Sequence, residues 1–133
     1  MQRVARLTYQ ILAWLFVVGA LLQFFLAGLG VFGTGASFEI HATLGIILVL
    51  VSIALLILAG LMTLTGNLTW HYVTSVSGLV VLMIVQYLLV ELFSERVAAL
   101  AALHPLNGLI VLGLAVYLAT ESRSFQFNEP RQP

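Results

Sequence analysis

Residues 40–64 read IHATLGIILVLVSIALLILAGLMTL and contain no charged side chain. A helix needs about 20 consecutive apolar residues to cross the hydrocarbon core of a bilayer, and this stretch is long enough. Three other apolar stretches also qualify, at 7–32, 70–93 and 97–119. The sequence therefore predicts an all-α, integral membrane four-helix bundle that forms one domain over residues 1–133, with a polar tail at 121–133.

The composition supports a membrane location. The chain is 62% hydrophobic and 8% charged, and its mean hydropathy is +1.13, whereas soluble domains carry roughly 25% charged residues. The net charge is zero and no basic patch is present, which argues against nucleic-acid binding. The absence of cysteine excludes disulfides and thiolate metal sites. The expected environment is the lipid bilayer.

The first apolar stretch follows Arg3 and Arg6 and could be mistaken for a signal peptide. Its apolar run is about twice the usual 7–15 residue core of such a peptide, so we expect a mature helix. Arginine placement then predicts the orientation, because cytoplasmic loops carry the excess of positive charge. Only Arg96 lies on the side opposite the termini. We therefore expect a multi-pass protein of a bacterial inner membrane with both termini cytoplasmic.

Cap and breaker residues predict where the helices begin and end. Ser37 is the expected N-cap of the second helix, Gly66-Asn67 its C-cap and turn, and Ser94 the N-cap of the fourth. Pro105 lies inside the fourth stretch. A proline there removes a helical hydrogen bond to the carbonyl four residues earlier, so we expect a kink at Pro105 that frees the carbonyl of Ala101.

An internal repeat with an offset of 63 residues relates the two halves of the chain. It superposes two pairs of residues that are rare in the apolar stretches, Gln23 with Gln86 and His41 with His104, and it also superposes Gly45 with Gly108. Each unit holds two helices, so both copies insert with the same topology. The expected architecture is two tandem helical hairpins related by a pseudo-twofold axis along the membrane normal.

Ionisable groups inside a bilayer are costly and suggest function. The pseudo-twofold axis should set His41 and His104 opposite each other, where two neutral imidazoles can provide both axial ligands of a haem iron. Gly45 and Gly108 lie one turn after each histidine and would let a flat macrocycle approach the backbones. The second ring nitrogen of each histidine needs an acceptor. The candidate acceptors are Gln23, Gln86, Asn107 and the carbonyl freed by Pro105, and Arg96 is the candidate partner of the haem propionates.

Other interpretations of the polar residues remain open. The histidines could simply hold neighbouring helices through glutamines, in bonds that contribute about 0.6–2 kcal/mol. Zinc usually takes three or four protein ligands, and only Glu39 could join the two histidines. His71 is expected at the membrane interface between two aromatic residues, and Glu91 is expected to reach the headgroups.

The motifs His41-x-x-x-Gly45 and Leu103-His104-Pro105-Leu106-Asn107-Gly108 resemble those of a group of small four-helix bacterial membrane proteins of unknown function. The stretch Gln23-Phe24-Phe25-Leu26-Ala27-Gly28 also resembles that group, so the resemblance covers almost the whole chain. More distantly, the layout is similar to membrane b-type cytochromes and to the four-helix halves of haem A synthase. That resemblance implies ligand roles for His41 and His104 only.

The sequence thus favours a protein that binds one haem b per chain, serving electron transfer with a membrane quinol or a periplasmic partner, or acting as a subunit of a redox complex. Because both axial positions would be filled, an enzymatic role at iron is not the expectation. The alternatives are a cofactor-free structural or accessory subunit, a small transporter, and a pigment- or quinone-binding subunit. Small residues on the helix faces leave room for a homodimer.

Overall fold

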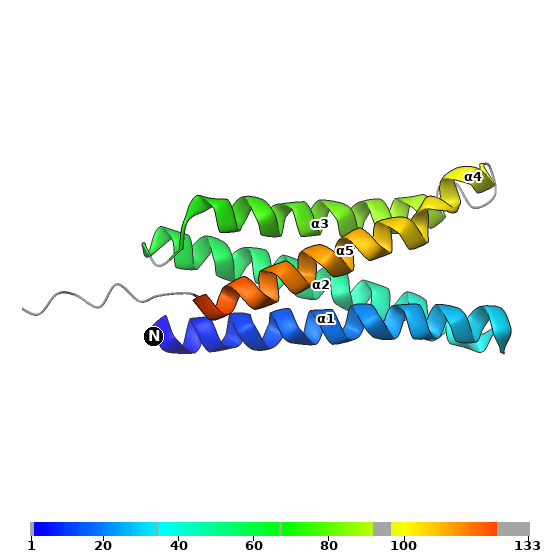
Figure 1. Ribbon diagram of the computed structural model, residues 1–133, viewed down its shortest axis with the longest axis horizontal. Helices are drawn as coiled ribbons and strands as arrows, with labels where there is room; N and C mark the ends of the chain where they lie inside the picture. Colours follow the sequence, from blue (N-terminus) through cyan, green and yellow to red (C-terminus); the bar gives the residue numbers. More distant parts are fainter. Residues whose placement is uncertain (1, 34, 67, 92–96, 125–133) are drawn as a thin grey trace, which may run out of the picture.

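The computed structural model describes residues 2–33, 35–66, 68–91 and 97–124 (Figure 1). In this part of the chain every regular element is a helix. These are α1 (Gln2–Phe32), α2 (Ala36–Leu64), α3 (Trp70–Glu91), the short α4 (Ala98–Ala101), α5 (Leu103–Glu121) and the 3-10 turn η1 (Ser122–Ser124). The predicted all-α four-helix architecture is confirmed.

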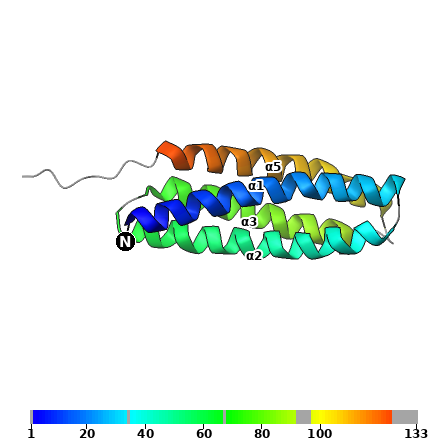
Figure 2. The same ribbon diagram turned by 90° about the horizontal axis from the view of Figure 1, so that it is seen from below.

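The four long helices form a ring in which each one packs against two neighbours. The neighbouring pairs are α1 with α2, α2 with α3, α3 with α5, and α5 with α1. Within the described residues, α1 and α3 therefore occupy one pair of opposite corners, and α2 and α5 occupy the other (Figures 1 and 2). This is the arrangement that two tandem hairpins related by a pseudo-twofold axis produce.

Each long helix can cross a membrane by length and composition. The spans are Arg3–Phe32, Ala36–Leu64, Trp70–Glu91 and Ala99–Glu121, and only 17–22% of each apolar window is buried inside the bundle. The remaining apolar side chains point outward, as expected where the surrounding solvent is lipid. The chain is a multi-pass membrane protein.

The buried core follows helical spacing and fills the half of the bundle nearer the chain ends. Its α1 face consists of residues three or four apart, as a helix that buries one stripe requires: Tyr9, Ala13, Phe16, Val17 and Ala20. The matching faces of the other helices contribute Leu55, Ala59, Tyr72, Val76, Leu79, Ala115 and Leu118. Near the opposite end this core stops at a layer formed by Ala20, Leu48, Met83 and Val111.

The connection between the hairpin helices α2 and α3 has the predicted C-terminal signal. Thr65 closes α2, and Gly66 follows with φ +76°. A positive φ is the conformation that glycine adopts at little cost and that commonly ends a helix. Asn67, the other residue of the predicted turn, lies outside the described residues.

The N-terminus of α2 differs from the prediction. The helix begins at Ala36 rather than at residue 40. Its N-cap residue is Gly35, and no side chain makes a capping hydrogen bond there. Ser37 is a buried residue within the first turn. The physical reason is that Ser37 is already helical, whereas an N-cap residue needs non-helical backbone angles to accept the capping bond. The predicted cap Ser94 lies outside the described residues.

The fourth membrane span is interrupted at Ala102 rather than kinked at Pro105. The short α4 ends at Ala101, and α5 begins at Leu103, so Pro105 lies in the first turn of α5. A proline is tolerated in a first turn, where the backbone N–H has no helical acceptor anyway. The fourth span, Ala99–Glu121, thus contains two helical segments separated by Ala102 alone, whose backbone stays in the αR region.

Both described chain ends meet at one end of the bundle. Arg6 Nη2 donates to the carbonyl of Arg123 at 2.9 Å, and Gln10 Nε2 donates to the carbonyl of Ser122 at 2.6 Å. The Arg123 guanidinium lies 4.9 Å from the centroid of the Trp14 ring, within the range of a cation–π contact. These contacts hold η1 against α1. The connection between α1 and α2 lies at the opposite end of the bundle.

Candidate functional site: a paired-histidine cavity

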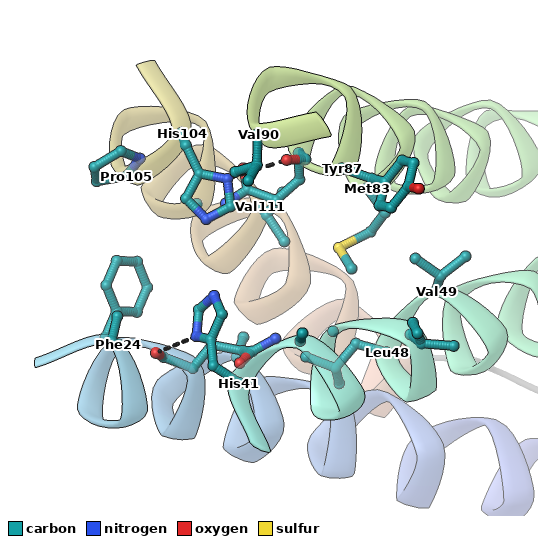
Figure 3. A pocket seen from close by; sticks show the side chains of 18 of the residues that line it. Phe24, His41, Leu48, Val49, Met83, Tyr87, Val90, His104, Pro105 and Val111 are labelled. Carbon is teal, nitrogen blue, oxygen red and sulfur yellow. Dashed lines mark hydrogen bonds between the residues drawn. The ribbon is translucent and has the colours of Figure 1, made fainter. Parts of the chain in front are cut away.

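His41 and His104 face each other across the bundle from the opposite corners occupied by α2 and α5. Their ring centroids are 6.1 Å apart and the rings are tilted by 54°. Because α2 begins at Ala36, His41 lies about 7.5 Å into its helix. His104 lies in the first turn of α5. The two histidines, distant in sequence, thus reach one site (Figure 3).

Each histidine is oriented by a main-chain carbonyl of its own hairpin. His41 Nδ1 lies 3.1 Å from the carbonyl oxygen of Gln23, and His104 Nδ1 lies 3.0 Å from that of Gln86. A carbonyl oxygen can only accept, so Nδ1 carries the hydrogen in both rings. In a neutral imidazole the other nitrogen then has a free lone pair. Figure 3 shows these two Nε2 atoms on the sides of the rings that face each other.

The glutamine side chains lie against the two repeated glycines. A Cβ atom added to Gly45 would meet Gln23 Nε2 at 3.0 Å, and one added to Gly108 would meet Phe24 Cζ at 3.3 Å and Gln86 Nε2 at 3.4 Å. In each hairpin the glycine therefore makes room for the side-chain amide of the repeated glutamine. The sequence suggested that this room serves a macrocycle, and the glutamine amides already take part of it.

The two halves differ in how their glutamine amides are satisfied. Asn107 Nδ2 donates to Gln86 Oε1 at 2.5 Å and to the carbonyl of Leu82 at 3.0 Å. The repeat places Leu44 where the second half has Asn107. Within the described residues, Gln23 Oε1 is buried and has no hydrogen-bond donor. Asn107, predicted as a histidine partner, instead bonds to Gln86.

A cavity of about 340 Å³ surrounds the two histidines above the layer where the core ends. Its volume is within the range of small-molecule and cofactor sites. Most of its wall consists of pairs 63 residues apart, one member from each hairpin: Ala20 with Met83, Gln23 with Gln86, Phe24 with Tyr87, Ala27 with Val90, His41 with His104, Ala42 with Pro105, Gly45 with Gly108, and Leu48 with Val111. The cavity has the same approximate twofold symmetry as the bundle.

The wall is apolar except for the histidines, the two glutamines, Tyr87 and Glu91. Among the described residues that line the cavity, Glu91 is the one that can carry a charge besides the histidines. The described arginines are Arg3, Arg6 and Arg123, and all belong to the opposite end of the bundle, where α1 starts and α5 ends. Arg96, predicted to pair with propionates, lies outside the described residues.

The remaining candidate residues lie apart from this cavity. His71 is exposed in the first turn of α3, at the end of the bundle opposite His41. Glu39 is exposed in the first turn of α2. Among the described residues, no group of three or more histidine or acidic side chains could hold a metal ion. The site therefore offers two protein ligands, both imidazoles.

Sequence reasoning did not single out the apolar wall of the cavity. Phe24 and Tyr87 on opposite walls, and Ala20 and Met83 beneath the histidines, were ordinary members of apolar helices. The signal that could have found them is their position beside the repeated glutamines, because Ala20 and Met83 lie one helical turn before Gln23 and Gln86, and Phe24 and Tyr87 follow them directly.

Fold and site together define a class: a multi-pass helical membrane protein, built as two equivalent hairpins, with a paired-histidine cavity between them. Within that class the chain belongs to the family of unknown function DUF6220, whose profile matches residues 23–94, just over half of the sequence. The matched range includes Gln23, His41, Gly45 and Gln86 and ends before His104. No curated protein and no solved structure matches the chain, so the distant resemblance to b-type cytochromes and haem A synthase stays a prediction.

Proposed function

We propose that this protein binds one haem b per chain, with His41 and His104 as the two axial ligands of the iron. The observation that carries the proposal is the geometry of the histidine pair. Two imidazoles that bind one metal ion from opposite sides, each through a nitrogen about 2 Å away, have ring centroids roughly 6 Å apart. The two rings here are 6.1 Å apart.

The hydrogen bonds of the rings support the same assignment. A metal-ligating histidine usually donates its other ring N–H to a carbonyl, which fixes the tautomer and the ring orientation. His41 and His104 both donate Nδ1–H to a glutamine carbonyl, and both present Nε2 to the cavity. A pair that only held helices together would need just one of its nitrogens, and it would not need to keep the other free and facing its counterpart.

A haem in this position would supply one-electron redox chemistry. Because two protein ligands fill both axial positions, the site suits electron transfer rather than oxygen activation. We propose a membrane quinol or a redox protein complex as the partner, a bacterial inner membrane as the location, and cytoplasmic termini. Propionates would point to the end of the bundle that carries α4, where Arg96 is the proposed partner. Association as a homodimer is compatible with this arrangement.

A cofactor-free structural or accessory subunit is the second candidate. It is favoured by the bond between Asn107 and Gln86 and by the two histidine–carbonyl bonds, which join the helices of each hairpin without any ligand. In that case the cavity would be a packing defect between two self-sufficient hairpins. A small transporter and a pigment- or quinone-binding subunit remain alternatives that no particular contact favours.

The deciding experiment uses the purified full-length protein in detergent, expressed with adequate haem supply. We expect Soret and α bands in the reduced-minus-oxidised spectrum and a haem-to-protein ratio near one. His41→Gly and His104→Gly should each change the six-coordinate, low-spin spectrum to a five-coordinate one, and added imidazole should restore the first. His71→Gly is the matched control and should leave the spectrum unchanged. Absence of the bands, or bands that neither cavity variant alters, would overturn the proposal.

A further inference from the structure

The cavity presents nearly the same surface to both faces of anything bound between the histidines. The axis that exchanges His41 with His104 runs along the bundle, and it also exchanges α1 with α3. A flat ligand held between the rings can therefore enter in two orientations, related by a half-turn about this axis. If the two halves were identical, both orientations would have equal free energy.

Haem b is unequal about the line that bisects its propionates. One lateral edge of the macrocycle carries two methyl groups, and the other carries a vinyl and a methyl group. With the propionates directed along the bundle axis, that line coincides with the pseudo-twofold axis of the protein. The two orientations then differ in which lateral edge meets α1 and which meets α3, and in which corner of the edge opposite the propionates carries a vinyl group.

The walls on the two sides are not equally bulky. The α1 wall carries Ala20 and Ala27, where the α3 wall carries Met83 and Val90 at the equivalent positions. The third pair, Phe24 with Tyr87, differs by one hydroxyl. Protein interiors are close-packed, so a difference of one or two methylenes at a contact changes its free energy. The room beside a bound macrocycle is thus greater on the α1 side.

We propose that these wall residues are the specificity-determining positions of the site, and that they select one orientation of the macrocycle. The selected orientation is the one that places the larger contacting substituents against Ala20 and Ala27 of α1. The smaller contacting substituents lie against Met83 and Val90 of α3. This inference rests on the proposed haem function, since it concerns how the haem is seated and not whether it binds.

The test is one-dimensional proton NMR of the ferric, low-spin holoprotein, whose haem methyl signals are shifted apart by the iron. Two orientations give two sets of methyl signals, and their intensity ratio is the ratio of populations. We expect an unequal ratio in the parent protein. Met83→Ala should bring the ratio toward one, and the double swap Ala20→Met with Met83→Ala should invert it. Met62→Ala, in the core at the other end, is the matched control and should leave the ratio unchanged.

An iron porphyrin symmetric about the propionate axis should give a single set of signals, which verifies that the two sets are orientations. The possible failures are distinct. A parent protein without haem signals contradicts the proposed function. A haem-bearing protein whose ratio is equal, or is unmoved by the swap, contradicts the orientation proposal and leaves haem binding intact. If only the double swap loses haem, the single variant Ala20→Met decides. It must shift the ratio of the two orientations in the direction expected for the double swap, and an unchanged ratio contradicts the orientation proposal.

Discussion

The amide of Asn107 donates to the amide oxygen of Gln86 at 2.5 Å, and this bond breaks the symmetry of the bundle. In the other hairpin Leu44 replaces the donor, and within the described residues Gln23 Oε1 is buried without one. A buried acceptor that loses its donor costs about 1–3 kcal/mol. The contact between the two helices of the second hairpin should therefore be more stable than the contact between those of the first.

Exchanging the residues at these two positions should move stability in opposite directions. Asn107→Leu leaves Gln86 without its donor, so we expect a loss of about 1–3 kcal/mol in the free energy of unfolding. Leu44→Asn supplies a donor to Gln23 and should add about 0.5–1.5 kcal/mol. Denaturant unfolding in mild detergent measures both. Leu50→Asn, on the exposed face of α2, is the control and should destabilise; a stabilised Leu50→Asn would show that the gain is unspecific.

The two cavity glycines should respond differently from the other glycines of their helices. An added methyl group would meet Gln23 Nε2 at Gly45, and Phe24 and Gln86 at Gly108, whereas Gly60 and Gly113 have nothing within 4 Å. We expect Gly45→Ala to destabilise by about 1 kcal/mol because the amide must shift, with a smaller effect for Gly108→Ala. Gly60→Ala and Gly113→Ala should be neutral or should stabilise by up to about 1 kcal/mol, as helix propensity predicts. Equal effects at all four positions would refute this packing account.

Glu91 should lower the reduction potential of a haem in this cavity. Glu91 is the acidic residue among the described residues that line the cavity, and a negative charge there would stabilise the more positive ferric state. Removing that charge with Glu91→Gln should raise the midpoint potential by tens of millivolts in a potentiometric titration. Glu39→Gln, exposed and away from the wall, is the matched control with the same loss of charge. A lower potential in Glu91→Gln, or the same rise in both variants, would contradict the role of Glu91.

The proposed orientation can be tested because the chain contains no cysteine. Gly35→Cys places a thiol in the connection between α1 and α2, and Thr69→Cys places one between α2 and α3, at opposite ends of the bundle. The described chain ends and the connection between α2 and α3 lie at the same end of the bundle (Figure 1). The positive charge beside the termini predicts that this end is cytoplasmic. In intact cells a membrane-impermeant maleimide should label Gly35→Cys and spare Thr69→Cys until the membrane is permeabilised. The reverse pattern would place the termini outside.

The sequence determined the architecture, because hydrophobicity over about 20 residues is enough to specify a membrane helix. It also paired the site residues, since a repeat of two helices requires that His41 and His104 occupy equivalent places. Helix ends were less well predicted. Ser37 has the chemistry of a cap, but the short connection after Phe32 starts α2 earlier, at Ala36. Pro105 was expected to kink one helix, whereas α4 ends at Ala101 and α5 begins at Leu103.

Only the tertiary structure decided how far apart the two rings lie and which nitrogens they present. The separation of 6.1 Å depends on how deep each histidine sits and how closely the hairpins pack, and a one-dimensional pattern contains neither quantity. The sequence named Gln23 and Gln86 as candidate acceptors, but only the fold decided that their main-chain carbonyls bind the rings. The sequence therefore specified two facing histidines. The packing of the four helices set their spacing, fixed their tautomers and left a cavity around their free nitrogens.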